Sequence, residues 1–191
     1  FFDSIYWQIA NCHAFSDFNA FYKTYTYETE LTFAYWLKEL ERGNMLPYLP
    51  FQSVLREMVC PTPNEEYFCC SYESSQIYLQ TDGSLYSCCG NITDSIPAIG
   101  SISGGYAFCH PKWTEYAICR ECQYNTICRG RCGRMHREFT PEHVSEYCAM
   151  NRFMFELFDR NKERLLSAYR TYPSYNKLLH SWKLDIMELT P

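Results

Sequence analysis

The chain has 191 residues, of which 47% are hydrophobic and 18% aromatic, and its formal net charge is −5. This length suits one or two domains with a core, and the composition excludes an intrinsically disordered chain. The acidic balance argues against a nucleic-acid partner, because such proteins carry an excess of Lys and Arg. No apolar run is long enough to span a membrane and no signal peptide is present, so we expect a cytoplasmic protein without a membrane partner.

The N-terminal third predicts one strand and two helices. Residues 3–10 combine aromatic and β-branched side chains and predict a buried strand. Ser16 or Asp17 can cap a helix that stops at Gly43, and Pro50 suits the first turn of a second helix. A strand followed by an amphipathic helix is half of a βαβ repeat. Because the sequence also begins without Met, we expect a fragment of a longer protein.

The middle of the chain predicts a small β-structure. Residues 76–88 predict a hairpin with a two-residue turn at Asp82-Gly83, because both residue types tolerate positive φ. Residues 94–105 are rich in Ser, Gly and Ile and predict a loop with at most one short strand.

The C-terminal part predicts one long helix. Thr140-Pro141-Glu142 is typical of a helix start, and the apolar spacing continues to Leu166. Residues 172–191 show no strong periodicity. Together these patterns predict an α+β fold.

The twelve cysteines are the most informative feature, and four of them lie within residues 119–132. Thiols this dense either form disulfides or bind metal. The chain has no signal peptide, and it is longer than most disulfide scaffolds. Adjacent pairs at Cys69-Cys70 and Cys88-Cys89 would also make an awkward disulfide framework. The sequence therefore favours metal-bound thiolates.

The spacing of the cysteines suggests two sites. Cys119 and Cys122 form a Cys-x-x-Cys pair that delivers two sulfurs to one point, and Cys128 is near enough to add a third. Cys148, in the following helix, is the candidate for the fourth. Cys132 follows a turn and can instead join two cysteines of the hairpin region, Cys70 and Cys88. Zinc also takes four thiolates, so spacing alone leaves zinc and iron–sulfur both open.

The full pattern resembles a known signature. The order Cys70-x12-Gly83-x4-Cys88, then Cys119-x2-Cys122-x5-Cys128-x3-Cys132, then Cys148 resembles the seven-cysteine SPASM signature of radical SAM enzymes that modify peptides and proteins. The resemblance is to anaerobic sulfatase-maturating enzymes and to archaeal-type peptide-modifying members. It covers residues 60–150, and by a weaker likeness residues 1–59 resemble the end of a radical SAM partial barrel. Residues 151–191 would then be a C-terminal helix and tail.

The resemblance implies two auxiliary [4Fe-4S] clusters and a ligand set for each. The second cluster would be held by Cys119, Cys122, Cys128 and Cys148. The first would be held by Cys70, Cys88 and Cys132, with Cys60, or alternatively Cys69, as fourth ligand. Cys12, Cys89 and Cys109 match nothing in the signature. Near the end of the first strand, Gln8 and Asn11 are candidates for contact with S-adenosylmethionine or substrate, because barrel active sites lie at that end. The alternative, which the residues themselves favour, is a polar strand end without such a contact.

Five arginines surround the cysteine segment: Arg120, Arg129, Arg131, Arg134 and Arg137. They can offset the negative charge of thiolate-bound clusters, or they can simply form a solvated face. The sequence leaves both interpretations open.

The radical-generating motif Cys-x-x-x-Cys-x-x-Cys is absent, because Cys128 and Cys132 are followed by Met135 where the third cysteine would stand. By resemblance, S-adenosylmethionine and a third cluster belong to a missing N-terminal radical SAM core. We therefore expect an auxiliary-cluster portion of a peptide- or protein-modifying oxidoreductase, inactive in radical generation alone. The alternatives are a stand-alone iron–sulfur electron carrier and a zinc-stabilised interaction module.

Overall fold

The computed structural model describes residues 4–7, 15–61, 77–86, 98–107, 112–131 and 133–181. The chain divides into two compact units, which we describe separately. Unit 1 comprises residues 1–63 and 142–191, and unit 2 comprises residues 64–141. The predicted domain boundaries after residues 59 and 150 stay a prediction.

Unit 1 begins with the two helices that the sequence predicts. Helix α1 (Phe18–Leu40) starts where Asp17 accepts the backbone N–H of Ala20 at 2.9 Å, and it stops just before Gly43, whose φ is +93°. A capping carboxylate satisfies an end N–H, and glycine takes the left-handed backbone without the Cβ penalty. Helix α2 (Leu49–Val59) carries Pro50 in its first turn, where the missing N–H costs nothing.

The C-terminal half of unit 1 is three helices rather than one helix and a tail. Helix α6 (Pro141–Arg160) begins at the predicted proline. It is interrupted at Asn161, whose side chain donates to the carbonyl of Leu157 at 2.8 Å, and α7 (Lys162–Thr171) follows. The predicted continuation of one helix through Leu166 was therefore wrong at this break, because a side-chain hydrogen bond there competes with the backbone ladder. Helix α8 (Ser174–Ser181) occupies a stretch with no predicted structure.

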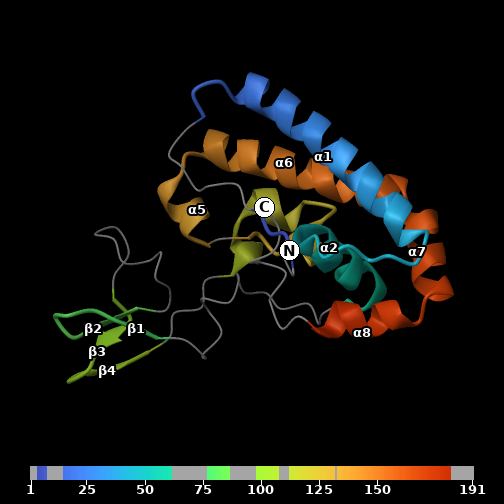
Figure 1. The fold of residues 1–191 in the computed structure, drawn as a ribbon. Helices are drawn as coiled ribbons and strands as arrows, with labels where there is room; N and C mark the ends of the chain where they lie inside the picture. The colour runs from blue at the N-terminus through green and yellow to red at the C-terminus, as the bar shows by residue number, and fades with distance from the viewer. Residues whose placement is uncertain are drawn as a thin grey trace. The chain divides into compact units, whose positions relative to one another are not determined.

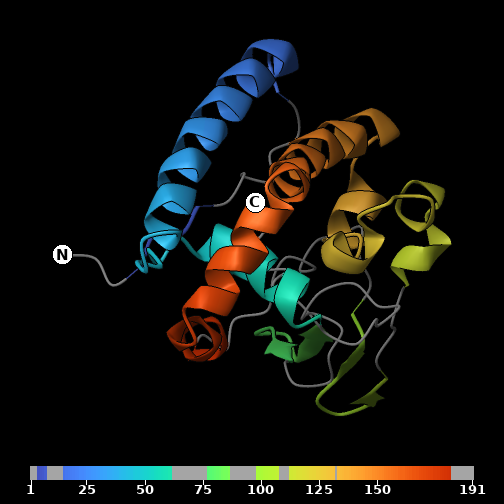
Figure 2. The ribbon, with the colours of Figure 1, turned by 90° about the vertical axis from the view of Figure 1, so that its right-hand side faces the viewer.

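An aromatic cluster forms the core of unit 1. Phe51 of α2 contacts Phe33 and Trp36 of α1 with ring centroids 5.5 Å apart in each case, and Phe158 of α6 lies 6.1 Å away. All four side chains are buried. Figures 1 and 2 show α1 and α6 as the two long helices, and contacts such as Phe33–Phe158 at 4.9 Å join them. Helix α8 packs beside α2.

The predicted buried strand at residues 3–10 was wrong in the part that the structure describes. Residues 4–7 make only one parallel bridge, between Ile5 and Tyr48, and the side chains of Ile5 and Tyr6 are 43% and 46% exposed. The neighbouring segment enters α2 at Leu49, whose N–H donates to the Ile5 carbonyl at 3.0 Å, so the ladder ends there. Residues 8–10 lie outside the described part.

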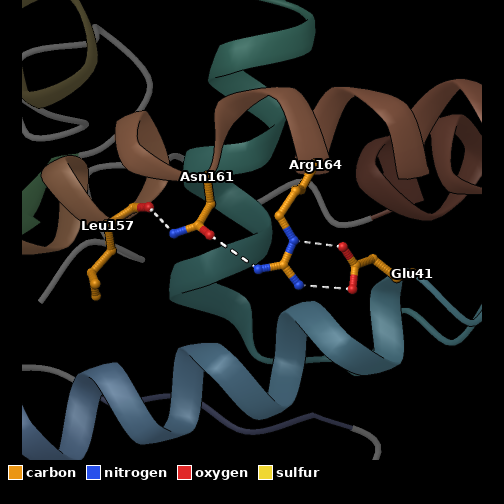
Figure 3. Close-up of polar contacts among 4 residues, drawn as sticks. All are labelled: Glu41, Leu157, Asn161 and Arg164. Carbon is orange, nitrogen blue, oxygen red and sulfur yellow. Dashed lines mark hydrogen bonds and ion pairs between the residues drawn. The ribbon is translucent and has the colours of Figure 1, made fainter.

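An ion pair fastens the end of α1 to the start of α7. Figure 3 shows the fork of Arg164 facing the carboxylate of Glu41, with N···O distances of 2.7 and 2.8 Å. The hydrogen bond from Arg164 lowers the pKa of Glu41 and the same contact raises the pKa of Arg164. Arg164 also donates to Asn161 at 3.3 Å, which links the pair to the helix break. Both side chains are partly exposed, so we expect the pair to set the geometry of this corner more than its stability.

Tyr175 makes the stability of unit 1 dependent on pH in the alkaline range. Its side chain is fully buried and its hydroxyl donates to the carbonyl of Leu40 at 2.6 Å. Burial, with a smaller contribution from Tyr172, raises the pKa of Tyr175 to about 12. The unfolded chain ionises this phenol near pH 10, whereas the folded chain keeps it neutral, so the unfolded state loses its proton first. The free energy of unfolding should fall as pH rises from about 10 to about 12, by roughly 2 kcal/mol from this group.

The Tyr175→Phe variant should lose that alkaline component and, at neutral pH, about 1 kcal/mol for the missing hydrogen bond. Denaturant unfolding at about pH 8, where the phenol is neutral in both states, and at about pH 10 and 11, where the unfolded chain ionises it, checks both effects. The exposed Tyr27→Phe variant is the control. Identical pH dependence in the wild type and Tyr175→Phe would contradict the assignment.

Unit 2 contains a four-stranded antiparallel sheet in the order β1 (Tyr78–Leu79), β2 (Ser84–Tyr86), β3 (Gly100–Ser101), β4 (Gly105–Tyr106). The first hairpin is the predicted one, but its loop has three residues, since Gln80 pairs with Ser84 through an N–H···O bond of 2.9 Å. Only Gly83 takes positive φ (+88°), and Asp82 instead accepts the N–H of Ser84. This is the turn followed by a left-handed glycine that suits three-residue hairpins.

The second hairpin falls where the sequence predicted a loop with at most one short strand. A Cβ at Gly100 would stand 2.1 Å from the carbonyl oxygen of Gly105, so the strands approach at a distance that only glycine allows. The glycine-rich sequence therefore permits close pairing here.

The rest of unit 2 is a series of short helices: η3 (Trp113–Glu115), α3 (Ala117–Arg120), α4 (Asn125–Cys128) and α5 (Gly133–Glu138). The mixture of helices and a small antiparallel sheet confirms the α+β class. In the ranges that the structure describes, no helix is both long and apolar enough to cross a membrane.

Candidate metal centre

Two one-turn helices position the first three cysteines of the segment. Cys119 lies on α3 and Cys128 on α4, while Cys122 stands in the turn between them. The N–H of Cys122 donates to the carbonyl of Cys119 at 3.1 Å, and the N–H of Cys128 donates to that of Tyr124 at 2.8 Å. These bonds hold the Cys-x-x-Cys pair in a tight turn, which is the local geometry that its spacing predicts.

A left-handed turn follows Cys128. Arg129, Gly130 and Arg131 have φ values of +49°, +67° and +56° in succession. The N–H of Arg131 donates to the carbonyl of Cys128 at 3.1 Å and closes the turn. Positive φ costs about 1 kcal/mol or more at each non-glycine residue. The two arginines therefore hold a strained backbone between Cys128 and Cys132, and a strained backbone is more common at functional sites than elsewhere.

The same two arginines are buried. Arg129 is 6% exposed and Arg131 8% exposed, and the Nε of Arg129 donates to the carbonyl of Thr126 at 3.4 Å. Arg120 and Arg137, by contrast, are exposed. Burying a guanidinium group is costly unless neighbouring groups compensate its charge. A solvated face therefore describes only part of the arginine run.

His136 is a site residue that the sequence analysis missed. Its Nε2 lies 3.0 Å from the carbonyl oxygen of Gly130 and 3.5 Å from the sulfur of Cys119. Its ring packs on that of Tyr116, with centroids 4.5 Å apart. Burial lowers the pKa of His136, an effect that the hydrogen bond with Gly130 only partly opposes, so the imidazole is neutral near pH 7. Its position just past the cysteine segment is the only sequence signal that could have indicated it.

None of the cysteines that the structure describes forms a disulfide bond: Cys60, Cys119, Cys122, Cys128 and Cys148. Cys119 is buried, whereas Cys122 and Cys128 are half-buried in unit 2. Cys148 is half-buried on α6 in unit 1, and Cys60 is exposed just after α2. The disulfide interpretation therefore finds no support among these five.

The structure does not gather a complete ligand set. Among the described residues, no group of three or more His, Cys, Asp or Glu side chains is arranged to hold a metal ion. Cys148 belongs to a different unit from Cys119, Cys122 and Cys128, so its joining them stays a prediction. The other predicted site residues lie outside the described ranges: Gln8, Asn11, Cys69, Cys70, Cys88 and Cys132. The same holds for the unassigned Cys12, Cys89 and Cys109.

By donor type alone, and not by the arrangement of the described side chains, the segment suits a thiolate-bound metal centre. Soft sulfurs outside disulfides, a ring N–H beside one of them and buried positive charge nearby are features that suit iron–sulfur clusters and zinc. The residues that would hold it in unit 2 are Cys119, Cys122 and Cys128.

Comparison with known proteins gives one informative match. No protein-family model matches the chain, and no curated protein matches it in sequence. A solved structure described as native anSMEcpe with bound AdoMet matches with a TM-score of 0.51 and 18% sequence identity. The match covers 93% of this chain and 48% of that one, so the chain spans about half the length of its structural neighbour. At this identity the likeness concerns the fold, which is similar to part of an AdoMet-binding protein.

Proposed function

We propose that this chain is the auxiliary [4Fe-4S] portion of a radical SAM oxidoreductase that modifies a residue of a peptide or protein. The observation that carries the proposal is the order and spacing of seven cysteines and one glycine from Cys70 to Cys148. A fold similar to part of an AdoMet-binding protein supports it, because SPASM domains adjoin the barrel that binds this cofactor.

The local structure of unit 2 supports a negatively charged sulfur site. Cys119 is buried beside a ring nitrogen, and two buried arginines follow Cys128 in a strained turn. Thiolate-bound clusters carry negative charge, and neighbouring cations and hydrogen bonds stabilise them and set their potential. Arg129 and Arg131 would compensate charge, and the short helices α3 and α4 would orient the sulfurs.

In this proposal the ligands divide into two sets. Cys119, Cys122, Cys128 and Cys148 hold one cluster. Cys70, Cys88 and Cys132 hold the other, with Cys60 or Cys69 as its fourth ligand. When bound, such clusters accept an electron or bind substrate during the radical reaction. The part of the enzyme that would bind and cleave S-adenosylmethionine, with its own cluster, lies outside this sequence, and Gln8 and Asn11 would face it or the substrate.

The zinc alternative has one observation in its favour. Three cysteines and one histidine form a common structural zinc set, and His136 stands beside Cys119. Against it, the Nε2 of His136 is 3.0 Å from the Gly130 carbonyl, which requires a proton on that nitrogen. The lone pair of the neutral ring then lies on Nδ1, so a zinc ligand at His136 would have to be that nitrogen and not the one beside Cys119.

The test is anaerobic reconstitution of the full chain with iron and sulfide, followed by analysis of iron, sulfide and zinc and by visible absorption. We expect about eight iron atoms per chain and the brown absorption of two [4Fe-4S] clusters. A colourless protein with zinc and without iron would refute the proposal. The coding sequence upstream of Phe1 separates an enzyme portion from a stand-alone carrier, because only the former continues into a Cys-x-x-x-Cys-x-x-Cys motif.

A further inference from the structure

His136 contacts two parts of the cysteine segment, the left-handed turn after Cys128 and helix α3. Its Nε2 contacts both the carbonyl oxygen of Gly130, inside the left-handed turn, and the sulfur of Cys119, on α3. A carbonyl oxygen only accepts hydrogen bonds, so at 3.0 Å the nitrogen must carry the hydrogen. An N–H cannot accept from a thiol S–H. The one hydrogen-bond relation open to Cys119 with this nitrogen is therefore that of acceptor.

This assignment fixes the direction of the hydrogen bond, from the ring N–H to the sulfur. A neutral thiol is a weak acceptor, whereas a thiolate or a metal-bound sulfur accepts well. Cys119 is 6% exposed, so little water competes for its sulfur. The ring N–H is therefore placed to donate to the sulfur of Cys119 when that sulfur binds a metal.

Packing fixes the ring in this position. The ring of Tyr116 lies on that of His136 at 4.5 Å, with an interplanar angle of 35°. The carbonyl of Tyr116 also accepts the N–H of Cys119 at 3.0 Å. The residue that holds the ring therefore also anchors the backbone of the cysteine that the ring contacts.

We propose that His136 is a positioning residue that donates an N–H···S hydrogen bond to Cys119 and ties this sulfur to the turn at Gly130. This inference rests on the proposed function, and it adds a residue outside the cysteine spacing pattern. A hydrogen bond to a cluster sulfur stabilises the reduced, more negative state and so raises the reduction potential. Partners of metal ligands also raise metal affinity, typically by about 10-fold or more.

Three substitutions separate the donor from the bulk of the ring. His136→Gln keeps an N–H at similar reach. His136→Asn keeps an amide but is shorter by one methylene, so it falls short of both acceptors. His136→Phe keeps a ring for Tyr116 and removes the donor. The control is His180→Phe, because His180 is an exposed residue in the last turn of α8 in unit 1.

The four variants and the wild-type chain are reconstituted anaerobically with iron and sulfide. The potential of each cluster is measured by redox titration followed by electron paramagnetic resonance, and iron retention by competition with a chelator. In His136→Phe and His136→Asn we expect one cluster to shift to lower potential and to lose iron at about 10-fold lower chelator concentration. His136→Gln should restore both values, and His180→Phe should match the wild type. Circular dichroism of the metal-free chains checks folding.

The possible results distinguish the proposed role of His136 from the proposed iron–sulfur clusters. Unchanged potential and iron retention in both His136→Phe and His136→Asn overturn the role of His136 while leaving the clusters intact. If His136→Gln does not restore the potential and the iron retention, ring packing explains the effect, and the role of His136 as a hydrogen-bond donor is overturned as well. If the wild type takes zinc alone, the cluster proposal fails, and zinc affinity in the same variants decides on His136. If the wild type binds neither metal, both proposals fail. If His136→Phe does not fold, the Gln and Asn variants decide.

Discussion

Substituting Cys132 with alanine should lower the iron content of the reconstituted chain from about eight atoms to about four. Cys132 belongs by spacing to the same short segment as Cys119, Cys122 and Cys128, yet the SPASM pattern assigns it to the other cluster. Loss of one thiolate leaves an iron of that cluster without its ligand and exposes it to loss. The second cluster should keep its iron and its potential. Metal analysis together with the resonance spectrum of the remaining cluster measures both.

Two matched alanine substitutions make this result interpretable. Cys122→Ala should remove the opposite half of the iron, because Cys122 belongs to the set with Cys119 and Cys128. Cys109→Ala should remove none, because Cys109 matches nothing in the signature. Equal loss of all iron in Cys132→Ala and Cys122→Ala would instead mean a single site or a collapsed fold. If Cys132→Ala and Cys122→Ala each keep half of the iron but give different spectra, the chain has two sites, and both take ligands from the same short segment.

The helices that the sequence predicted well are those with local chemistry at their ends. Asp17 and Gly43 mark the limits of α1, and Pro50 and Pro141 stand in the first turns of α2 and α6. Capping and proline preferences act over a few residues, so they can be read without knowing the fold. Among the side chains that the structure describes, α8 buries Tyr175 and Leu179, which lie one turn apart, and two positions are too few for a periodic signal.

The site combines a local turn that the sequence predicts with tertiary contacts that it does not predict. The cysteine spacing predicts the tight turn from Cys119 to Cys122, because the bonds that form it are local. The contact between His136 and Cys119 joins residues 17 positions apart, and nothing in their identities pairs them. The burial of Arg129 and Arg131 was equally hidden, since charged residues are mostly exposed. Tertiary packing decided these features.

Phe51→Ala should be the most damaging single substitution in unit 1, at a cost of about 3 to 5 kcal/mol. The side chain is fully buried and lies at the centre of the aromatic cluster, within 5.1 Å of Trp7 and 5.5 Å of both Phe33 and Trp36. Removing the ring takes away its transfer free energy and leaves a cavity that rigid aromatic neighbours cannot fill. A marginally stable unit could lose most of its folded population through this change alone.

The measurement is denaturant unfolding followed by far-ultraviolet circular dichroism, with Tyr27→Ala as the matched control. Tyr27 is also an aromatic residue of unit 1 but is 62% exposed, so its loss should change the unfolding free energy by about 0.5 kcal/mol or less. Phe51→Leu should fall between the two, because it refills much of the volume. If Phe51→Ala and Tyr27→Ala unfold at the same denaturant concentration, the aromatic cluster is not the core of unit 1. The stability of α1, α2 and α6 must then come from contacts elsewhere, such as the buried Tyr175 and Leu40 pair.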